Sequence, residues 1–105
     1  MTSIHAKLLS AALALSLAAP AFAAEVDRRQ ANQQARIAEG VESGQLTPGE
    51  TARLERREAK TRREIRRDRT ANGGTLTPAE RAKINREENR TSRAIYRAKH
   101  NDNHM

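Results

Sequence analysis

The chain has 105 residues, with 20 lysine and arginine residues against 13 acidic ones, no cysteine and only two aromatic residues. The lack of cysteine excludes disulfides and argues against a lipid-anchored lipoprotein. The few large apolar residues exclude a large hydrophobic core, and the positive net charge favours anionic partners.

Residues 1–23 have the pattern of a secretory signal peptide. Lys7 precedes an apolar run over residues 8–19, which is too short to cross a bilayer. Pro20 ends this run, and Ala21 and Ala23 are the small residues that signal peptidase requires. We expect cleavage after Ala23 and a periplasmic or secreted mature chain with 19 basic and 13 acidic residues, a net charge of +6. An uncleaved membrane anchor is the alternative.

Two similar stretches divide the remaining chain. Residues 43–50 read Ser-Gly-Gln-Leu-Thr-Pro-Gly-Glu, and residues 73–80 read Gly-Gly-Thr-Leu-Thr-Pro-Ala-Glu. In each, threonine is a typical helix N-cap, proline suits the first helical position, and glutamate completes a capping box. These signals predict helices at about 25–40, 48–69 and 78–99. The expected fold is all-α, a small antiparallel three-helix bundle (residues 24–99) built from repeated helix-turn-helix units, with a polar tail at 100–105.

Each predicted helix carries a stripe with the spacing i, i+4, i+7, i+11, apolar at both ends and polar in the middle. The stripes are Val26, Gln30, Gln33 and Ile37; Leu54, Glu58, Thr61 and Ile65; and Ile84, Glu88, Thr91 and Ile95. We expect a hydrogen-bonded polar layer in which Arg57 or Arg62 neutralises Glu58. Side chains expected to close the ends are Val41, Leu46, Ala52, Leu76, Ala82 and Ala98. Poorly packed helices that associate only on oligomerisation are the alternative architecture.

The second and third predicted helices carry arginines at matching positions. Their spacing suggests one broad basic side that binds an acidic protein or an anionic envelope surface, formed by Arg56, Arg63, Arg67, Arg86, Arg93 and Arg97. Arginine alternating with glutamate is also typical of an ordinary solvated helix face. Without bulky apolar residues opposite the arginines, we expect little insertion into lipid.

The first turn resembles the calcium loop of the EF-hand. With Glu50 at the twelfth position of such a loop, Gly44 falls at the sixth, and Glu39 and Ser43 fall at ligand positions. In the second turn, Arg69 and other residues without side-chain oxygens occupy the ligand positions, so the chain resembles a degenerate EF-hand pair. Calcium held by Glu39, Ser43 and Glu50 is therefore an alternative function.

Two further resemblances concern exported bacterial proteins. The Leu-Thr-Pro helix starts, the charge and the length resemble periplasmic chaperones and stress sensors of the Spy and CpxP kind, which implies a chaperone-like or stress-accessory role. The chain departs from that class in having glutamate at the motif's last position. The Ser-Gly-x-Leu-Thr-x-x-Glu pattern and the closing segment 92–101 also resemble a group of uncharacterised exported bacterial proteins.

Other chemistries have less support in the sequence. A pocket for catalysis by Glu58 and Glu88 is not indicated, and there is no cysteine nucleophile. His100 and His104 flank Asp102 on the predicted tail, a pattern that could hold a transition metal weakly. A single tyrosine in the mature chain disfavours specific nucleic-acid binding. We expect a small exported non-enzymatic protein that binds acidic proteins or anionic envelope components.

Overall fold

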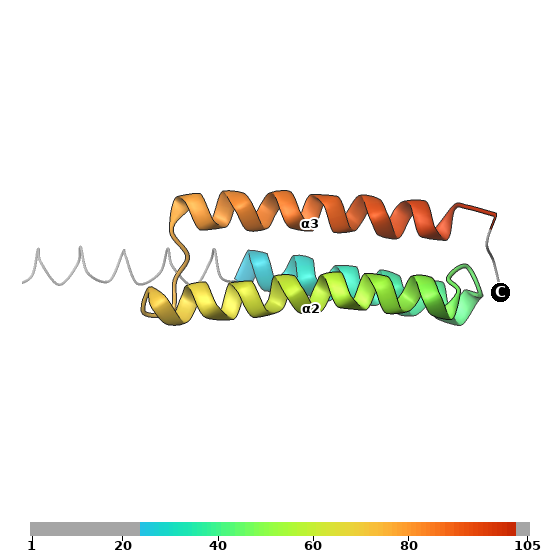
Figure 1. Cartoon of the computed structure of the whole chain (residues 1–105), viewed down its shortest axis with the longest axis horizontal. Coiled ribbons are helices and arrows are strands. Elements are labelled where there is room, and N and C mark those ends of the chain that lie inside the picture. The colour runs from blue at the N-terminus through green and yellow to red at the C-terminus, as the bar shows by residue number, and fades with distance from the viewer. Residues whose placement is uncertain (1–23, 103–105) are drawn as a thin grey trace, which may run out of the picture.

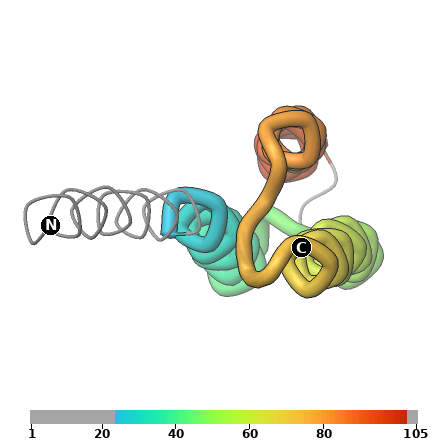
Figure 2. The backbone as a smooth tube through the Cα atoms, turned by 90° about the vertical axis from the view of Figure 1, so that its left-hand side faces the viewer, coloured from blue at the N-terminus to red at the C-terminus, as the bar shows by residue number. Residues whose placement is uncertain are grey.

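The computed structural model describes residues 24–102, and within this range the chain folds into three antiparallel helices and no strand. The first helix covers residues 24–43, α2 covers Pro48–Ala71 and α3 covers Pro78–Lys99 (Figure 1). Seen end-on, the three helices lie at the corners of a triangle (Figure 2). The structure thus confirms the predicted all-α three-helix bundle. The predicted signal peptide and residues 103–105 lie outside the described range.

Both α2 and α3 begin with the predicted capping box. The Thr47 N–H donates to Glu50 Oε1 at 2.9 Å, and the Glu50 N–H donates back to Thr47 Oγ1 at 3.2 Å. The same reciprocal pair joins Thr77 and Glu80, at 2.9 and 3.1 Å. These bonds satisfy amide groups that the helix itself leaves without partners, so each helix has a fixed starting residue.

The first helix and α2 run further than the sequence suggested. The first helix passes through Gly40 and ends at residue 43, because the backbone reverses only at Gly44, which has φ of +79°. Gly40 stays helical and lets Leu46 pack directly against it: a Cβ there would lie 2.7 Å from Leu46 Cδ1. The second connection, residues 72–77, is two residues longer than the first, residues 44–47. Positive φ at both Gly73 and Gly74 forms its extra turn.

All twelve stripe residues are buried, which confirms the predicted core face of each helix. The apolar members form two separate clusters, one at each end of the bundle. The cluster near the first turn contains Ile37, Leu46, Leu54 and Ile95, with Ala94 and Ala98 packed against it. The cluster near the second turn contains Val26, Ile65 and Ile84, with half-buried Leu76 packed against it. The polar stripe residues lie between these two clusters.

Three of the residues expected to close the ends do not do so. Val41 is 51% exposed, and Ala52 and Ala82 are also exposed. Leu46 folds back over the Gly40 side of the first helix, so Val41 on the other flank stays outside. Ala52 and Ala82 lie two residues before their stripes, which places them on the far side of each helix. Within residues 24–102, no helix is both long and apolar enough to cross a membrane.

Candidate functional site

The six arginines predicted to bind partners are all exposed. None of their guanidinium groups makes an ion pair or hydrogen bond within residues 24–102, so all six remain available to an external anion. They lie on the outer surfaces of α2 and α3, with Arg56, Arg63 and Arg67 on the first of these helices and Arg86, Arg93 and Arg97 on the second.

The structure separates these arginines into two strips. On each helix the three arginines fall about 180° around the axis from the buried stripe, because residues advance by about 100° per position. Both stripes face the same core, so the two outer surfaces point in different directions. Arg97 also lines a hollow between the two helices. The fold therefore presents two basic strips, one per helix.

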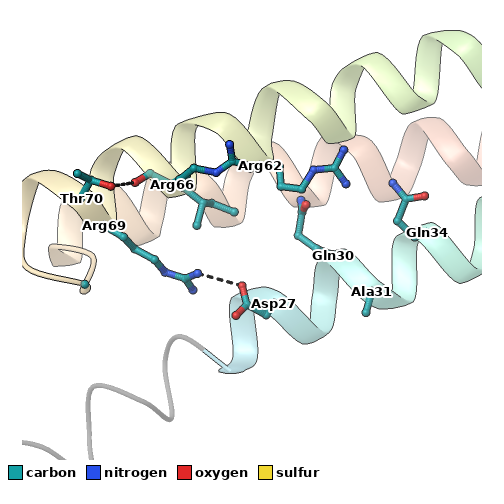
Figure 3. A pocket seen from close by; sticks show the side chains of 10 residues that line it. Asp27, Gln30, Ala31, Gln34, Arg62, Arg66, Arg69 and Thr70 are labelled. Carbon is teal, nitrogen blue, oxygen red and sulfur yellow. Dashed lines mark hydrogen bonds and ion pairs between the residues drawn. The ribbon is translucent and has the colours of Figure 1, made fainter.

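A groove of about 490 Å³ runs between the first helix and α2 (Figure 3). Its lining includes three arginines of α2, which are Arg62, Arg66 and Arg69. Two glutamines of the first helix, Gln30 and Gln34, and the apolar core residue Ile65 also line it. The groove therefore combines several hydrogen-bond donors with a small apolar surface.

The charges in this groove are only partly neutralised. Arg69 Nη1 lies 3.1 Å from Asp27 Oδ1, which forms an ion pair across the groove. Gln34 Nε2 donates to Glu55 Oε2 at 3.0 Å. Arg62 and Arg66 are exposed and make no ion pair within the described residues. Two positive charges thus remain in the groove.

Sequence reasoning did not single out Arg62, Arg66 and Arg69 as a group. Their spacing of four and three residues places them on one flank of the α2 stripe. The spacing in the sequence places the three arginines on one flank of α2, but it does not show whether this flank faces the first helix or α3. That choice depends on the handedness of the three-helix bundle, which the periodicity of the sequence does not determine.

The opposite flank of α2 faces α3 and is also basic. Two smaller hollows between these helices are lined by five basic side chains, Arg53, Arg57, Lys60, Arg90 and Arg97. None of the five forms an ion pair within residues 24–102. Nearby, Lys83 Nζ bridges the two helices by pairing with Glu64 Oε1 at 2.8 Å. Most of the cationic side chains at this junction are therefore unpaired.

The polar centre of the core contains two buried carboxyl groups that lack hydrogen bonds. Glu58 is 1% exposed and Glu88 is 0% exposed, and none of their carboxyl oxygens has a hydrogen-bond partner within residues 24–102. Burial raises the pKa of each to about 7. Glu55 and Glu88 raise the pKa of Glu58 further, whereas Arg62 lowers it.

The expected hydrogen-bonded layer is therefore incomplete. Gln33 Nε2 donates to the Glu88 carbonyl at 2.8 Å and to Ser92 Oγ at 2.9 Å. Glu88 Oε1 lies 3.8 Å from Arg29 Nη1. The Arg29 charge and the Gln30 side chain both lower the pKa of Glu88, which opposes the increase caused by burial. Neither Arg57 nor Arg62 forms an ion pair with Glu58. The charge of Arg62 lowers the pKa of Glu58, but the carboxylate is not neutralised by a direct contact with either arginine, because both lie on exposed flanks of α2 while Glu58 points into the core.

The first turn is organised around helix capping. Glu50 accepts the Thr47 N–H at one carboxyl oxygen and Asn101 Nδ2, at 2.6 Å, at the other. These bonds lower the pKa of Glu50. Ser43 Oγ bonds within the turn to Gly40 and Gln45, and Glu39 is exposed on the first helix. Calcium binding here stays a prediction, and bidentate ligation would require Glu50 to give up both bonds.

The histidine pattern at the end of the chain is only partly within the described residues. The ring of His100 stacks on Tyr96 with centroids 4.0 Å apart, and its Nδ1 lies 2.7 Å from the Tyr96 carbonyl oxygen. His104, its predicted partner in metal binding, lies outside the described range. In the part of the chain that the structure describes, no group of three or more histidine, cysteine, aspartate or glutamate side chains is placed to hold a metal ion.

Comparison with known protein families, with curated proteins and with solved structures gave no match to this chain. We therefore infer function from the residues themselves.

Proposed function

We propose that this chain is an exported, non-enzymatic protein that binds anionic partners, either acidic proteins or anionic components of the cell envelope. Binding occurs through the arginines on the outer surfaces of α2 and α3. A chaperone-like or stress-accessory role would follow if such partners include partly unfolded acidic proteins.

One observation carries this proposal. All six outer arginines are exposed, and none forms an ion pair with an acidic side chain within residues 24–102. Internal ion pairs would neutralise these charges if the strips served only to stabilise the bundle. The basic lining of the α2–α3 hollows adds to the same field. Together they produce a positive potential that attracts and orients anions.

Binding measurements test the proposal directly. The purified protein should bind vesicles that contain anionic lipid, or an acidic polypeptide such as polyglutamate, and the affinity should fall steeply as salt is added. Replacing all six outer arginines with glutamine should strongly weaken binding to polyglutamate, whereas replacing them with lysine should largely preserve it. Undiminished binding of polyglutamate by the glutamine variant would contradict the proposal.

The chaperone-like role needs a separate assay. The protein should suppress aggregation of an acidic client at near-stoichiometric amounts, and high salt should remove the effect. Inertness towards several such clients would remove this role and leave anion binding as the function. Export itself is tested by the mass of the protein recovered from the cell envelope, which should correspond to cleavage after Ala23.

A further inference from the structure

We propose that the groove between the first helix and α2 is a binding site for the phosphate of an organic phosphomonoester, held by Arg62 and Arg66. This inference rests on the proposed function, because it names the anion that one part of the basic surface accepts. It differs in using a defined groove in place of the open outer strips.

The net charge of the groove suits this ligand. Three arginines line it, and Asp27 neutralises one of them through the ion pair with Arg69. Two positive charges remain on Arg62 and Arg66. A phosphomonoester carries about −1.5 to −2 charges at neutral pH, whereas a carboxylate or phosphodiester carries about −1. A doubly charged phosphate group therefore matches the lining most closely.

The arrangement of donors suits it as well. Arg62 and Arg66 are four residues apart, so their side chains leave α2 on the same flank and line the same groove. Each guanidinium presents a planar fork that can donate two parallel hydrogen bonds to phosphate oxygens. Figure 3 shows these arginines extending from α2, opposite Gln30 and Gln34 on the first helix. The charged donors thus come from the α2 wall of the groove.

Gln30 belongs to the inner wall of the groove. The residue is 9% exposed, and its side chain extends from the first helix towards α2 (Figure 3). Its amide atoms are buried and lower the pKa of Glu88 in the core, so they are not donors to a ligand in the groove. The hydrogen bonds to phosphate therefore come from Arg62 and Arg66.

The apolar part of the lining favours an ester over free phosphate. Ile65 and Ala31 also line the groove. Its volume of about 490 Å³ lies within the usual range for sites that hold small organic molecules. We therefore expect the organic part of the ligand to lie on this apolar surface while the phosphate faces Arg62 and Arg66.

The test compares phosphate chemistry at matched charge. The purified protein is titrated with glycerol phosphate, with inorganic phosphate, and with phosphatidylcholine vesicles that carry either phosphatidic acid, a monoester, or phosphatidylglycerol, a diester, at equal surface charge. We expect tighter binding to the monoester form and weaker binding to inorganic phosphate. Preference for glycerol phosphate indicates a soluble ligand, and preference for phosphatidic acid indicates a lipid headgroup; either result supports the site. Equal binding of monoester and diester would overturn it.

Matched variants locate the site. R62Q/R66Q should weaken monoester binding roughly tenfold or more, because hydrogen bonds to charged groups are lost. R63Q/R67Q removes the same charge from the outer surface of the same helix. It should weaken binding to anionic vesicles but change the affinity for glycerol phosphate less than about twofold. R62K/R66K keeps the positive charges but loses the planar guanidinium groups. Its affinity should therefore lie between those of R62Q/R66Q and R63Q/R67Q. Equal losses in both glutamine variants would overturn the groove site while leaving the proposed function intact.

A measurement on the unaltered protein covers the case in which a variant fails to fold. On addition of glycerol phosphate, the NMR signals of Arg62 and Arg66 Nε–H should shift, while those of Arg63 and Arg67 stay fixed. Shifts confined to the outer arginines would refute the groove site. Failure to bind any anionic vesicle or polypeptide would refute the proposed function as well.

Discussion

The two ends of the bundle and its middle are built in opposite ways. At each end, large aliphatic side chains from all three helices meet in an apolar cluster. In the middle, the two central positions of each stripe carry glutamine, threonine or glutamate, and these residues are also buried. The ends gain stability from removing apolar surface from water, whereas the middle loses it by removing carboxyl groups from water.

This difference shows that the stripe specifies which face of each helix is buried, although not every buried residue of the stripe stabilises the folded protein. The carboxyl oxygens of Glu58 and Glu88 accept no hydrogen bond from the residues that the structure describes, so each carboxyl is stabilised by taking up a proton. The protein is positively charged overall, yet Arg62 and Arg29 are the cations that lower the pKa values of these two carboxyls, and neither lies within hydrogen-bonding distance of them. The middle of the bundle should therefore respond to pH while the ends do not.

Truncation at the ends should have the largest effect. Ile84 is fully buried in the cluster near the second turn, so Ile84→Ala should cost about 2–5 kcal/mol of unfolding free energy. Thr61→Ala removes a buried side chain from the middle and should cost less. Chemical denaturation followed by circular dichroism measures both. Equal costs would show that the ends and the middle contribute alike.

Stability should fall as pH rises. The folded-state pKa of Glu58 and of Glu88 is raised to about 7, so the folded chain retains protons that the unfolded chain loses above its pKa of about 4.5. The stabilisation is complete below that lower pKa and is lost as pH rises through 7. Allowing for solvent relaxation, we expect a loss of about 2 kcal/mol per carboxyl between pH 5 and pH 8.

Two variants isolate this effect. E58Q/E88Q should flatten the dependence of the melting temperature on pH, because the side chains no longer ionise. Glu39→Gln makes the same replacement of a carboxylate by an amide at an exposed residue. It should leave the dependence of the melting temperature on pH unchanged. Unaltered pH dependence in E58Q/E88Q would assign it to other groups.

The buried stripe of each helix could be predicted from the sequence, because the spacing of apolar and polar residues is a local property of each helix. It predicted burial of Glu58 and Glu88 from position alone, although carboxylates are usually exposed. It failed for Val41 and for Arg57, whose surroundings depend on how neighbouring elements pack. The groove at Arg62 and Arg66 was missed for the same reason, since it exists only where the first helix lies against that flank of α2.

A substitution at Gly40 tests how tightly the first-turn end is packed. A Cβ at this residue would lie 2.7 Å from two atoms of Leu46, so Gly40→Ala should destabilise the bundle by about 1–3 kcal/mol. A Cβ added at Gly49, in the first turn of α2, would meet no atom within 4 Å. Gly49→Ala should therefore be neutral or slightly stabilising. A harmless Gly40→Ala would mean that this end adapts easily.

The smallest effect is expected at Gln33 in the middle. Gln33→Leu removes the bonds to the Glu88 carbonyl and Ser92 Oγ but buries an apolar side chain of similar size. The change in unfolding free energy should stay below about 1 kcal/mol, because the lost bonds and the gained burial offset each other. A large loss, measured by denaturation at pH 5, would mean that the polar middle is a stabilising network.

The contrast between ends and middle depends most on the protonation of the two buried carboxyls. Their ionisation can be followed individually by NMR titration of the side-chain carboxyl carbons of Glu58 and Glu88 in the folded protein. We expect pKa midpoints of about 7 for both. Midpoints near 4.5, the ordinary pKa of a glutamate side chain, would contradict this contrast.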